Sequence, residues 1–398
     1  MPKINNILGV SMASTSSNTR YGKRDDSLLV CIEPGNTISA KFTNNSFKSA
    51  PVLIAQEHLK KLSGGKSVLM INAGNANAGT GKQGRKDALE CCQSVAKNLE
   101  VPLHSVLPFS TGVIGEPLKT KNYVEAFSKA SKKLNSHNWL KASKSILTTD
   151  TKPKLLSRKI KCGSNTVSIT GFAKGSGMIR PDFATLLSFV FIEASINKSL
   201  LKAIHTEALL ESFERITVDG DTSPNDSSVL AASGKTALKI IKGTANERKI
   251  RKAIIEIYQE LAKQLIQDAE GATKEVLINV SHAKSNEQAK SVAFTVAESP
   301  LVKTALFGND ANWGRILSAV GRSEGIDDVS KVTIDLNGTP LAKNGNIDPK
   351  HSESKASKAI KRKKLSINIK LGQGKKSYSV MTSDFSEDYL LINSDYRS

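Results

Sequence analysis

The chain has 398 residues, of which 39% are hydrophobic and 24% charged. This composition excludes an intrinsically disordered protein, and the length predicts two or three structural units. No run of about 18 apolar residues is present, which argues against a membrane-spanning helix, and the start lacks the apolar stretch of a secretory signal, so we expect a cytoplasmic protein. Lys and Arg outnumber Asp and Glu by 57 to 37, which gives a net charge of +20.

Strand-like and helix-like segments alternate along the first half of the chain. The β-rich apolar runs at 27–32 and 67–71 predict strands. A glycine-rich turn then leads into a predicted helix over 82–99, and another apolar run covers 106–109. The polar stretch 135–165 is expected to form a long excursion from the fold.

The second half continues the same alternation. Its predicted helices are 194–213 and 245–268, both with apolar residues at i, i+3 and i+4. Its predicted strands are 186–192, 277–280, 332–336 and 365–371. The last of these alternates apolar and polar residues, which is typical of a half-buried strand. The whole pattern predicts an α/β or α+β protein with substantial sheet.

The positive charge is concentrated in two stretches. Residues 119–161 hold twelve Lys and Arg against two acids, and residues 350–376 hold ten against one. Such clusters are compatible with binding a polyanion, so a basic nucleic-acid-binding protein is a distant alternative. No aromatic residue lies within 355–364 to stack on bases, and we interpret both stretches as solvated surface.

Cysteine and histidine give no support to metal chemistry. The four cysteines form no CxxC pair, and the six histidines show neither HxxxH nor HExxH spacing. We therefore predict no metal site and no bound cofactor.

Two segments suggest acyl-transfer chemistry. Thr111 and Gly112 follow an apolar run, and a hydroxyl beside a flexible glycine is suited to an oxyanion hole. Ala184 and Thr185 come just before a strongly apolar strand. If the chain breaks before Thr185, the freed α-amine becomes a base for the neighbouring hydroxyl. Taken alone, Thr185 is simply a β-branched residue at the start of a strand.

Two acidic segments are less specific. The stretch 216–227 packs Asp219, Asp221 and Asp226 together without the spacing of an EF-hand, so we interpret it as an Asx-rich turn. Glu270 stands near the end of a predicted helix, where the helix dipole disfavours an acid, and this local conflict hints at a function.

Taken in order, these segments resemble the glutamate N-acetyltransferase (ornithine acetyltransferase) family of arginine biosynthesis. The matching pieces are NAGNANAGTG (72–81), STGVIGE (110–116), LTTDTKPK (147–154), AKGSGMIRPDFATLL (173–187), FERITVDGDTSPND (213–226), DAEGATK (268–274), VKTALFGNDANWGRI (302–316) and YLLINSDYRS (389–398). The resemblance implies an N-terminal-nucleophile fold, with stacked sheets flanked by helices.

The resemblance also implies self-cleavage between Ala184 and Thr185. An α chain 1–184 and a β chain 185–398 would result, intertwined and assembled as a heterotetramer of two α and two β chains. Thr185 would carry an acetyl group from N2-acetylornithine to glutamate, and Thr111 and Gly112 match the oxyanion-hole pair. Acetyl-CoA is open as a co-substrate.

The substrate-binding positions follow from the same motifs. Besides Thr185, the matching residues are Lys174, Glu270, Asn393, Ser398 and a threonine of the TTDT sequence, for which Thr149 is preferred and Thr148 stays open. Asp182 and Phe183 stand where the family usually has Asn and Met, which bears on the rate of cleavage. A threonine-nucleophile amidase or aminopeptidase, in which water takes the acyl group, is the alternative enzyme.

Overall fold

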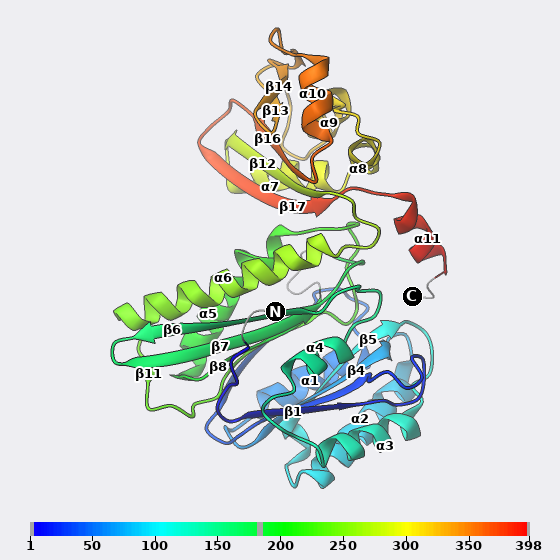
Figure 1. The fold of residues 1–398 in the computed structure, drawn as a ribbon, viewed down its shortest axis with the longest axis vertical. Coiled ribbons are helices and arrows are strands. Elements are labelled where there is room, and N and C mark those ends of the chain that lie inside the picture. The colour runs from blue at the N-terminus through cyan, green and yellow to red at the C-terminus, as the bar shows by residue number, and fades with distance from the viewer. Residues whose placement is uncertain (1–3, 181–185, 396–398) are drawn as a thin grey trace.

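The computed structural model describes residues 4–180 and 186–395. Figure 1 shows a layered lower body, built from the N-terminal and central parts of the chain, and a separate C-terminal part above it. The chain crosses between the two parts after the long helix α6 and returns along the C-terminal helix α11. This return brings α11 back toward the lower body.

The first sheet of the lower body has four strands in the order β1-β2-β4-β5. Its strands are β1 (Val10–Thr15), β2 (Ser27–Ile32), β4 (Ser67–Asn75) and β5 (Val106–Val113). β4 and β5 run parallel, and α2 (Gly81–Asn98) connects them. Every residue of β2 and β4 is buried, as expected for a sheet covered on both faces.

The second sheet has five strands in the order β3-β10-β8-β7-β6. Its strands are β3 (Thr37–Phe42), β6 (Lys154–Cys162), β7 (Asn165–Lys174), β8 (Leu187–Ile192) and β10 (Ser227–Ala232). β8 lies at the centre with all six residues buried, which explains why its sequence is apolar except for Ser188. β8 and β10 are parallel, with Leu187 opposite Ser227.

The two sheets pack face to face. One hydrophobic core joins their inner faces, with Leu69 and Phe109 from the first sheet and Phe172 and Phe189 from the second. The outer face of the first sheet packs on α2 and α3 (Thr120–Ser131), and that of the second on α5 (Lys198–Leu210) and α6 (Ala245–Gln267). The body is thus a four-layer α-β-β-α sandwich, which confirms the predicted stacked sheets flanked by helices.

Shorter elements complete the body. The ends of the inter-sheet core are covered by α1 (Ala50–Lys60) and α4 (Trp139–Ser145), whose Val52 and Trp139 are buried in it. A two-stranded pair, β9 (Ser195–Ile196) and β11 (Lys239–Ile240), lies beside the second sheet.

The C-terminal part is a six-stranded sheet packed on four helices. Its strands, in the order β15-β14-β13-β16-β12-β17, are β12 (Glu275–Ala283), β13 (Thr333–Leu336), β14 (Thr339–Lys343), β15 (Asn346–Ile347), β16 (Lys364–Lys370) and β17 (Lys376–Ser383). The helices are α7 (Asn286–Ala297), α8 (Pro300–Phe307), α9 (Trp313–Gly321) and α10 (Glu353–Ile360), and α11 (Glu387–Asp395) follows the sheet. β16 alternates buried and partly exposed residues, as its sequence predicts.

The expectation of a long excursion over 135–165 is wrong. This stretch forms α4 and β6, and the Trp139 ring lies 5.5 Å from that of Phe191 in the core. The sequence did not predict β6 as a strand because β6 lies at the edge of its sheet. Edge strands carry exposed Lys and Arg, which hide the alternation of apolar and polar residues.

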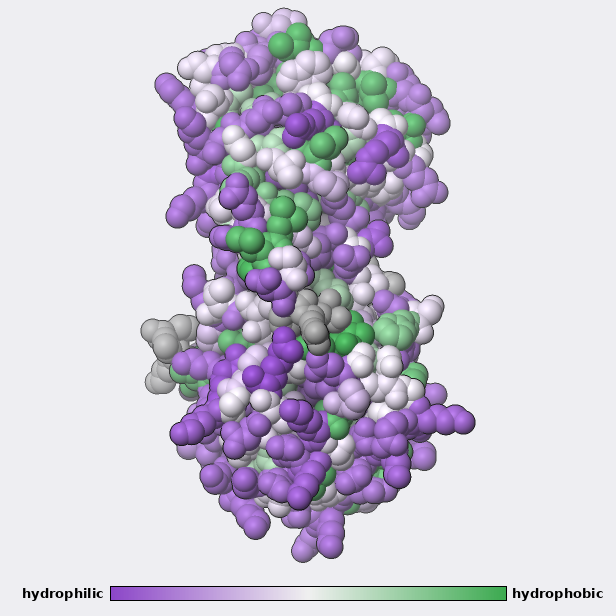
Figure 2. Space-filling view, turned by 90° about the vertical axis from the view of Figure 1, so that its right-hand side faces the viewer, coloured by the Kyte–Doolittle hydropathy of each residue, from purple (hydrophilic) through white to green (hydrophobic). Residues whose placement is uncertain are grey.

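Apart from Lys154, which is buried, the Lys and Arg side chains of the two basic stretches are at least partly exposed. The first stretch lies on α3, α4 and β6, and the second on α10, β16 and the turn after it. Figure 2 shows hydrophilic side chains over most of one face of the molecule, with a constriction between its two parts. Within residues 4–180 and 186–395, no helix has the length and apolarity needed to cross a bilayer.

Candidate active site

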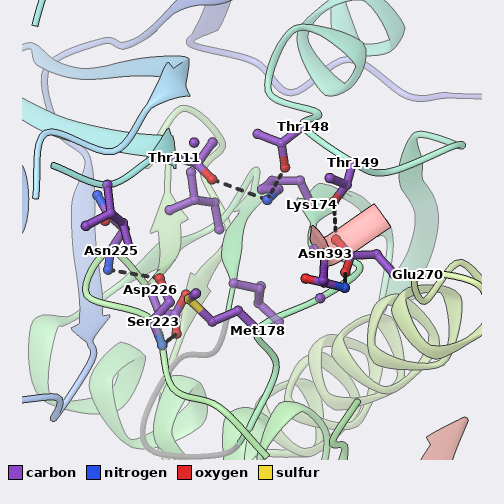
Figure 3. A pocket seen from close by; sticks show the side chains of 16 residues that line it. Thr111, Thr148, Thr149, Lys174, Met178, Ser223, Asn225, Asp226, Glu270 and Asn393 are labelled. Carbon is purple, nitrogen blue, oxygen red and sulfur yellow. Dashed lines mark hydrogen bonds between the residues drawn. The ribbon is translucent and has the colours of Figure 1, made fainter. Parts of the chain in front are cut away.

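A pocket forms where chain segments far apart in the sequence meet (Figure 3). It holds about 700 Å³ of space that is continuous with solvent. Seven of the residues singled out from the sequence line it together: Thr111, Gly112, Thr148, Thr149, Lys174, Glu270 and Asn393. The described lining includes no histidine or cysteine. The groups of this lining that can exchange protons are carboxyls, an amine and hydroxyls.

Thr111 and Gly112 lie at the end of β5, beside the end of its parallel neighbour β4. Gly112 has φ = +128°, a conformation that residues with a Cβ rarely adopt. A Cβ built on it would lie 2.3 Å from the carbonyl carbon of Gly74 and 2.5 Å from the nitrogen of Asn75. Position 112 therefore requires glycine, which lets the two strand ends approach this closely.

Lys174 is the last residue of β7, and its side chain crosses to two threonines of the pocket wall. Its Nζ donates to Thr111 Oγ1 at 3.2 Å and to Thr148 Oγ1 at 2.9 Å. Of the described acids, Asp150 comes nearest, with its Oδ2 3.9 Å from the Lys174 Nζ. An ammonium group is thus presented to the pocket between two hydroxyls.

Beneath Lys174 lies a buried ionic network centred on Asp150. The carboxylate of Asp150, fully buried, accepts from Lys154 Nζ at 2.6 Å and from the Gly175 backbone N–H at 2.7 Å. Lys154 also contacts Asp268 at 2.5 Å. Burial alone would raise the pKa of Asp150, but the ammonium groups of Lys174 and Lys154 and the hydrogen bonds outweigh it and lower the pKa to about 2.

This shift predicts an acid-dependent loss of stability. Because the folded-state pKa of Asp150 lies below its unfolded value, the ionised carboxylate stabilises the fold above about pH 4, and that stabilisation is lost as the pH falls toward 2. We expect a loss of about 2 kcal/mol from this group. Urea unfolding of the wild type and Asp150→Asn should show a stability difference that shrinks between pH 4 and 2. Asp310→Asn, at an exposed position, is the control and should show no such pH dependence.

Glu270 lies on the opposite side of the pocket from Thr111 (Figure 3). Its Oε1 accepts from Thr149 Oγ1 at 2.6 Å and its Oε2 from Asn393 Nδ2 at 2.9 Å. A Cβ at Gly177 would lie 2.2 Å from Glu270 Oε2, so the loop after β7 passes directly over the carboxylate. Helix α6 ends at Gln267, so Glu270 follows the helix, and the expected conflict with the helix dipole is relieved by that short connection.

Asn393 reaches the pocket from α11, the helix that returns from the C-terminal part. The helix is anchored through Tyr389, whose ring stacks on Phe385 with centroids 4.5 Å apart and whose hydroxyl lies 3.4 Å from Asp219 Oδ2. Asp219 also accepts the backbone N–H groups of Met178 and Ile179, at 2.6 and 3.0 Å. One carboxylate thus joins α11 to the loop after β7.

Sequence reasoning missed the contribution of the stretch 216–227, which we interpreted only as an Asx-rich turn. Ser223, Asn225 and Asp226 line the pocket. Burial raises the pKa of Asp226 well above its usual value, which favours the neutral carboxylic acid. The signal that locates this stretch is the sheet topology. The stretch precedes β10 just as Ala184 and Thr185 precede β8, and β10 and β8 are parallel neighbours. Parallel neighbours begin at the same edge of a sheet.

Ala184, Thr185 and Ser398 lie outside the described residues. The described residues on either side of the proposed cleavage position do reach the pocket: Met178 lines it on one side and Leu186 on the other. The Leu186 carbonyl accepts from Ser227 N–H at 2.8 Å, which fixes the start of β8 beside Asp226.

The ArgJ family model matches residues 11–398 of this chain. The arginine biosynthesis bifunctional protein ArgJ of Methylococcus capsulatus is 41% identical over 394 residues, which cover 98% of this chain and 96% of that protein. The protein of the same name from Psychrobacter arcticus is 41% identical over 396 residues, covering 98% and 97% of the two chains.

Among solved structures, a crystal structure of the arginine biosynthesis bifunctional protein from Bacillus halodurans is 33% identical. It matches with a TM-score of 0.48 and covers 51% of this chain and 96% of that chain. The family model and the two curated relatives together confirm the resemblance seen in the sequence. The chain belongs to the ArgJ family.

Proposed function

We propose that this protein transfers an acetyl group from N2-acetylornithine to glutamate through an acetylated Thr185, after its own cleavage between Ala184 and Thr185. The observation that carries the proposal is the convergence of seven residues from five separate motifs on one pocket, which is also lined by Met178 and Leu186. Membership of the ArgJ family, whose curated relatives are named arginine biosynthesis proteins, supports the same reaction.

In the first half-reaction, Thr185 Oγ attacks the acetyl carbon of N2-acetylornithine. The α-amine of Thr185 takes the hydroxyl proton and passes it to the departing nitrogen as the carbon–nitrogen bond breaks, so ornithine leaves with its amine restored. The acetyl oxygen becomes an oxyanion in this step. Thr111 Oγ1–H and Gly112 N–H are the proposed donors to it.

The second half-reaction reverses these steps with another amine. The α-amine of glutamate attacks the acetyl ester, the bond to Thr185 Oγ breaks, and the released oxygen regains its proton through the α-amine of Thr185. The products are N-acetylglutamate and the free enzyme. A threonine amine and hydroxyl suffice for both proton transfers, in agreement with a described lining that lacks histidine.

Charge complementarity supports the choice of substrate. Lys174 presents an ammonium group suited to the α-carboxylate that acetylornithine and glutamate share. Across the pocket, Glu270 presents a carboxylate suited to the side-chain ammonium of ornithine, with Asn393 beside it. Thr148 and Thr149 both line the pocket, and Ser398 is proposed to join them from the end of the chain.

The direct test is turnover of N2-acetylornithine with and without glutamate. The proposal predicts ornithine release that depends on glutamate and an equal amount of N-acetylglutamate. Release at the same rate without glutamate would instead establish the amidase alternative, in which water takes the acetyl group. Acetyl-CoA, which the sequence leaves open as a second donor, is tested in the same assay by replacing acetylornithine with it.

Glu270→Gln is expected to raise the KM for N2-acetylornithine by about 10- to 100-fold, because it removes the charge that faces the ornithine ammonium while keeping the shape of the side chain. Steady-state kinetics with N2-acetylornithine as the varied substrate measure it. Glu260→Gln, on α6 away from the pocket, is the matched control and should leave KM unchanged. An unchanged KM in both variants would remove Glu270 from substrate recognition.

The assembly follows from the proposed cleavage. We propose an α chain 1–184 and a β chain 185–398 that stay together, because β7 of the first pairs with β8 of the second and β3 of the first pairs with β10 of the second. The heterotetramer and the cytoplasmic location remain predictions from the sequence.

A further inference from the structure

The hydrogen bonds of Lys174 determine which way two pocket hydroxyls can donate. An ammonium group has three N–H donors and no lone pair, so Thr111 Oγ1 and Thr148 Oγ1 must both act as acceptors toward it. Each hydroxyl then keeps its own hydrogen for another partner. Among the described residues, neither hydroxyl has another acceptor, so both hydrogens are available to a ligand in the pocket.

On the opposite side of the pocket, a threonine hydroxyl donates its hydrogen to a carboxylate instead of accepting one from an ammonium group. A carboxylate can only accept, so Thr149 donates its single hydrogen to Glu270 Oε1. The hydroxyl of Ser176, 2.8 Å from Thr149 Oγ1, must then donate to Thr149. Thr148 is consequently a donor toward the pocket and Thr149 is not, although the two are adjacent in the sequence.

This arrangement depends on Lys174 being charged. A neutral amine carries a lone pair and would accept the hydrogen of Thr111, which would turn the hydroxyl away from the pocket. Among the described residues, the carboxylate closest to Lys174 Nζ is that of Asp150, at 3.9 Å and with a fully buried side chain. The same carboxylate accepts from Thr148 N–H at 3.2 Å and Gly175 N–H at 2.7 Å, so it also fixes the backbone on both sides of the contact.

We propose that Asp150 is a positioning residue of the oxyanion hole, which holds the ammonium group of Lys174 in place and thereby directs the hydroxyl hydrogen of Thr111 toward the acetyl oxygen. The inference rests on the proposed acetyl transfer. It gives Lys174 a role beyond binding a substrate carboxylate. The third N–H of Lys174 donates to neither threonine and can serve that binding. It also assigns Thr148, rather than Thr149, as a hydrogen-bond donor to substrate.

A double-mutant cycle on the acetylation step tests whether Asp150 acts through the Thr111 hydroxyl. Asp150→Asn removes the charge at nearly constant shape, and Thr111→Val removes the hydroxyl. The readout is the single-turnover rate of β-chain acetylation by saturating N2-acetylornithine, followed by intact mass and normalised to the cleaved fraction. We expect Thr111→Val to lower this rate by about 10²- to 10³-fold and Asp150→Asn by about tenfold or more.

If Asp150 acts through Thr111, the double variant should be no more than about threefold slower than Thr111→Val alone, because the hydroxyl to be directed is already gone. If the two effects instead multiply, Asp150 does not act through Thr111 and the inference is wrong. If Asp150→Asn fails to fold, Asp150→Glu, which keeps the charge but displaces the carboxylate, takes its place in the same cycle with the same expectation.

Asp268→Asn is the matched control. Asp268 is the other carboxylate on Lys154, so its loss disturbs the same buried network, but no described contact joins it to Lys174. Its effect on acetylation should be below about threefold and should multiply with that of Thr111→Val. A wild-type protein that transfers no acetyl group would contradict the proposed function. In an active protein, effects of Asp150→Asn and Thr111→Val that multiply would contradict only the positioning role of Asp150.

Discussion

Thr185→Ala is expected to leave the protein as a single polypeptide of 42.8 kDa and to lower acetyl transfer by about 10⁴-fold or more. Both effects have one cause, because the same hydroxyl is proposed to attack the peptide bond before it and later the acetyl carbon of the substrate. Denaturing electrophoresis or intact mass measures the first effect, and glutamate-dependent ornithine release measures the second.

Two further variants make that result interpretable. Thr185→Ser keeps a hydroxyl and should retain both cleavage and transfer at reduced rates. Thr304→Ala, at an exposed position of α8, removes a threonine hydroxyl far from the chemistry and should behave as the wild type. If Thr185→Ala is still cleaved and still transfers acetyl groups, Thr185 is not the nucleophile.

Gly112→Ala is expected to lower kcat by about 10²- to 10³-fold, the usual effect of losing an oxyanion-hole donor. The added Cβ would meet the backbone of Gly74 and Asn75 at 2.3 to 2.6 Å, and backbone atoms cannot swing aside as the end of a side chain does. The strand end must therefore shift, and the Gly112 N–H and the adjacent Thr111 hydroxyl move with it. Steady-state kinetics at saturating substrate measure the loss.

The fold of this variant also needs a control, since φ = +128° is unfavourable for alanine. Gly65→Ala is the matched substitution, because a Cβ there would find no atom within 4 Å and the backbone conformation is ordinary. It should keep full activity and thermal stability. Full activity of Gly112→Ala would show that the Thr111–Gly112 corner does not form the oxyanion hole.

Much of the fold was predictable from local sequence. The run at 27–32 forms β2 with the predicted bounds, and the helix predicted over 245–268 ends one residue earlier, at Gln267. β2 carries a continuous apolar signal because it is buried on both faces, and α6 carries a periodic one because it is buried along one side. The edge strand β6 lacked such a signal, and the packing of sheet on sheet depends on contacts between distant segments that no local pattern encodes.

The residues of the candidate site were likewise predictable only in part. Thr111, Lys174 and Glu270 were found because family motifs contain them, and the structure brings them together. Asp150 lies inside the LTTDTKPK motif but was assigned no role, because its importance depends on its burial and on its contacts with Lys154 of the same motif and Lys174 of β7. Asp226 was missed because an Asp in a turn resembles any other until the parallel pairing of β10 with β8 places it in the pocket.

The most direct test of the central claim is the intact mass of the purified wild-type protein under denaturing conditions. The account predicts two polypeptides, 1–184 and 185–398, whose masses together equal that of the 42.8 kDa chain plus one water molecule. A single uncleaved chain that still transfers acetyl groups from N2-acetylornithine to glutamate would contradict it.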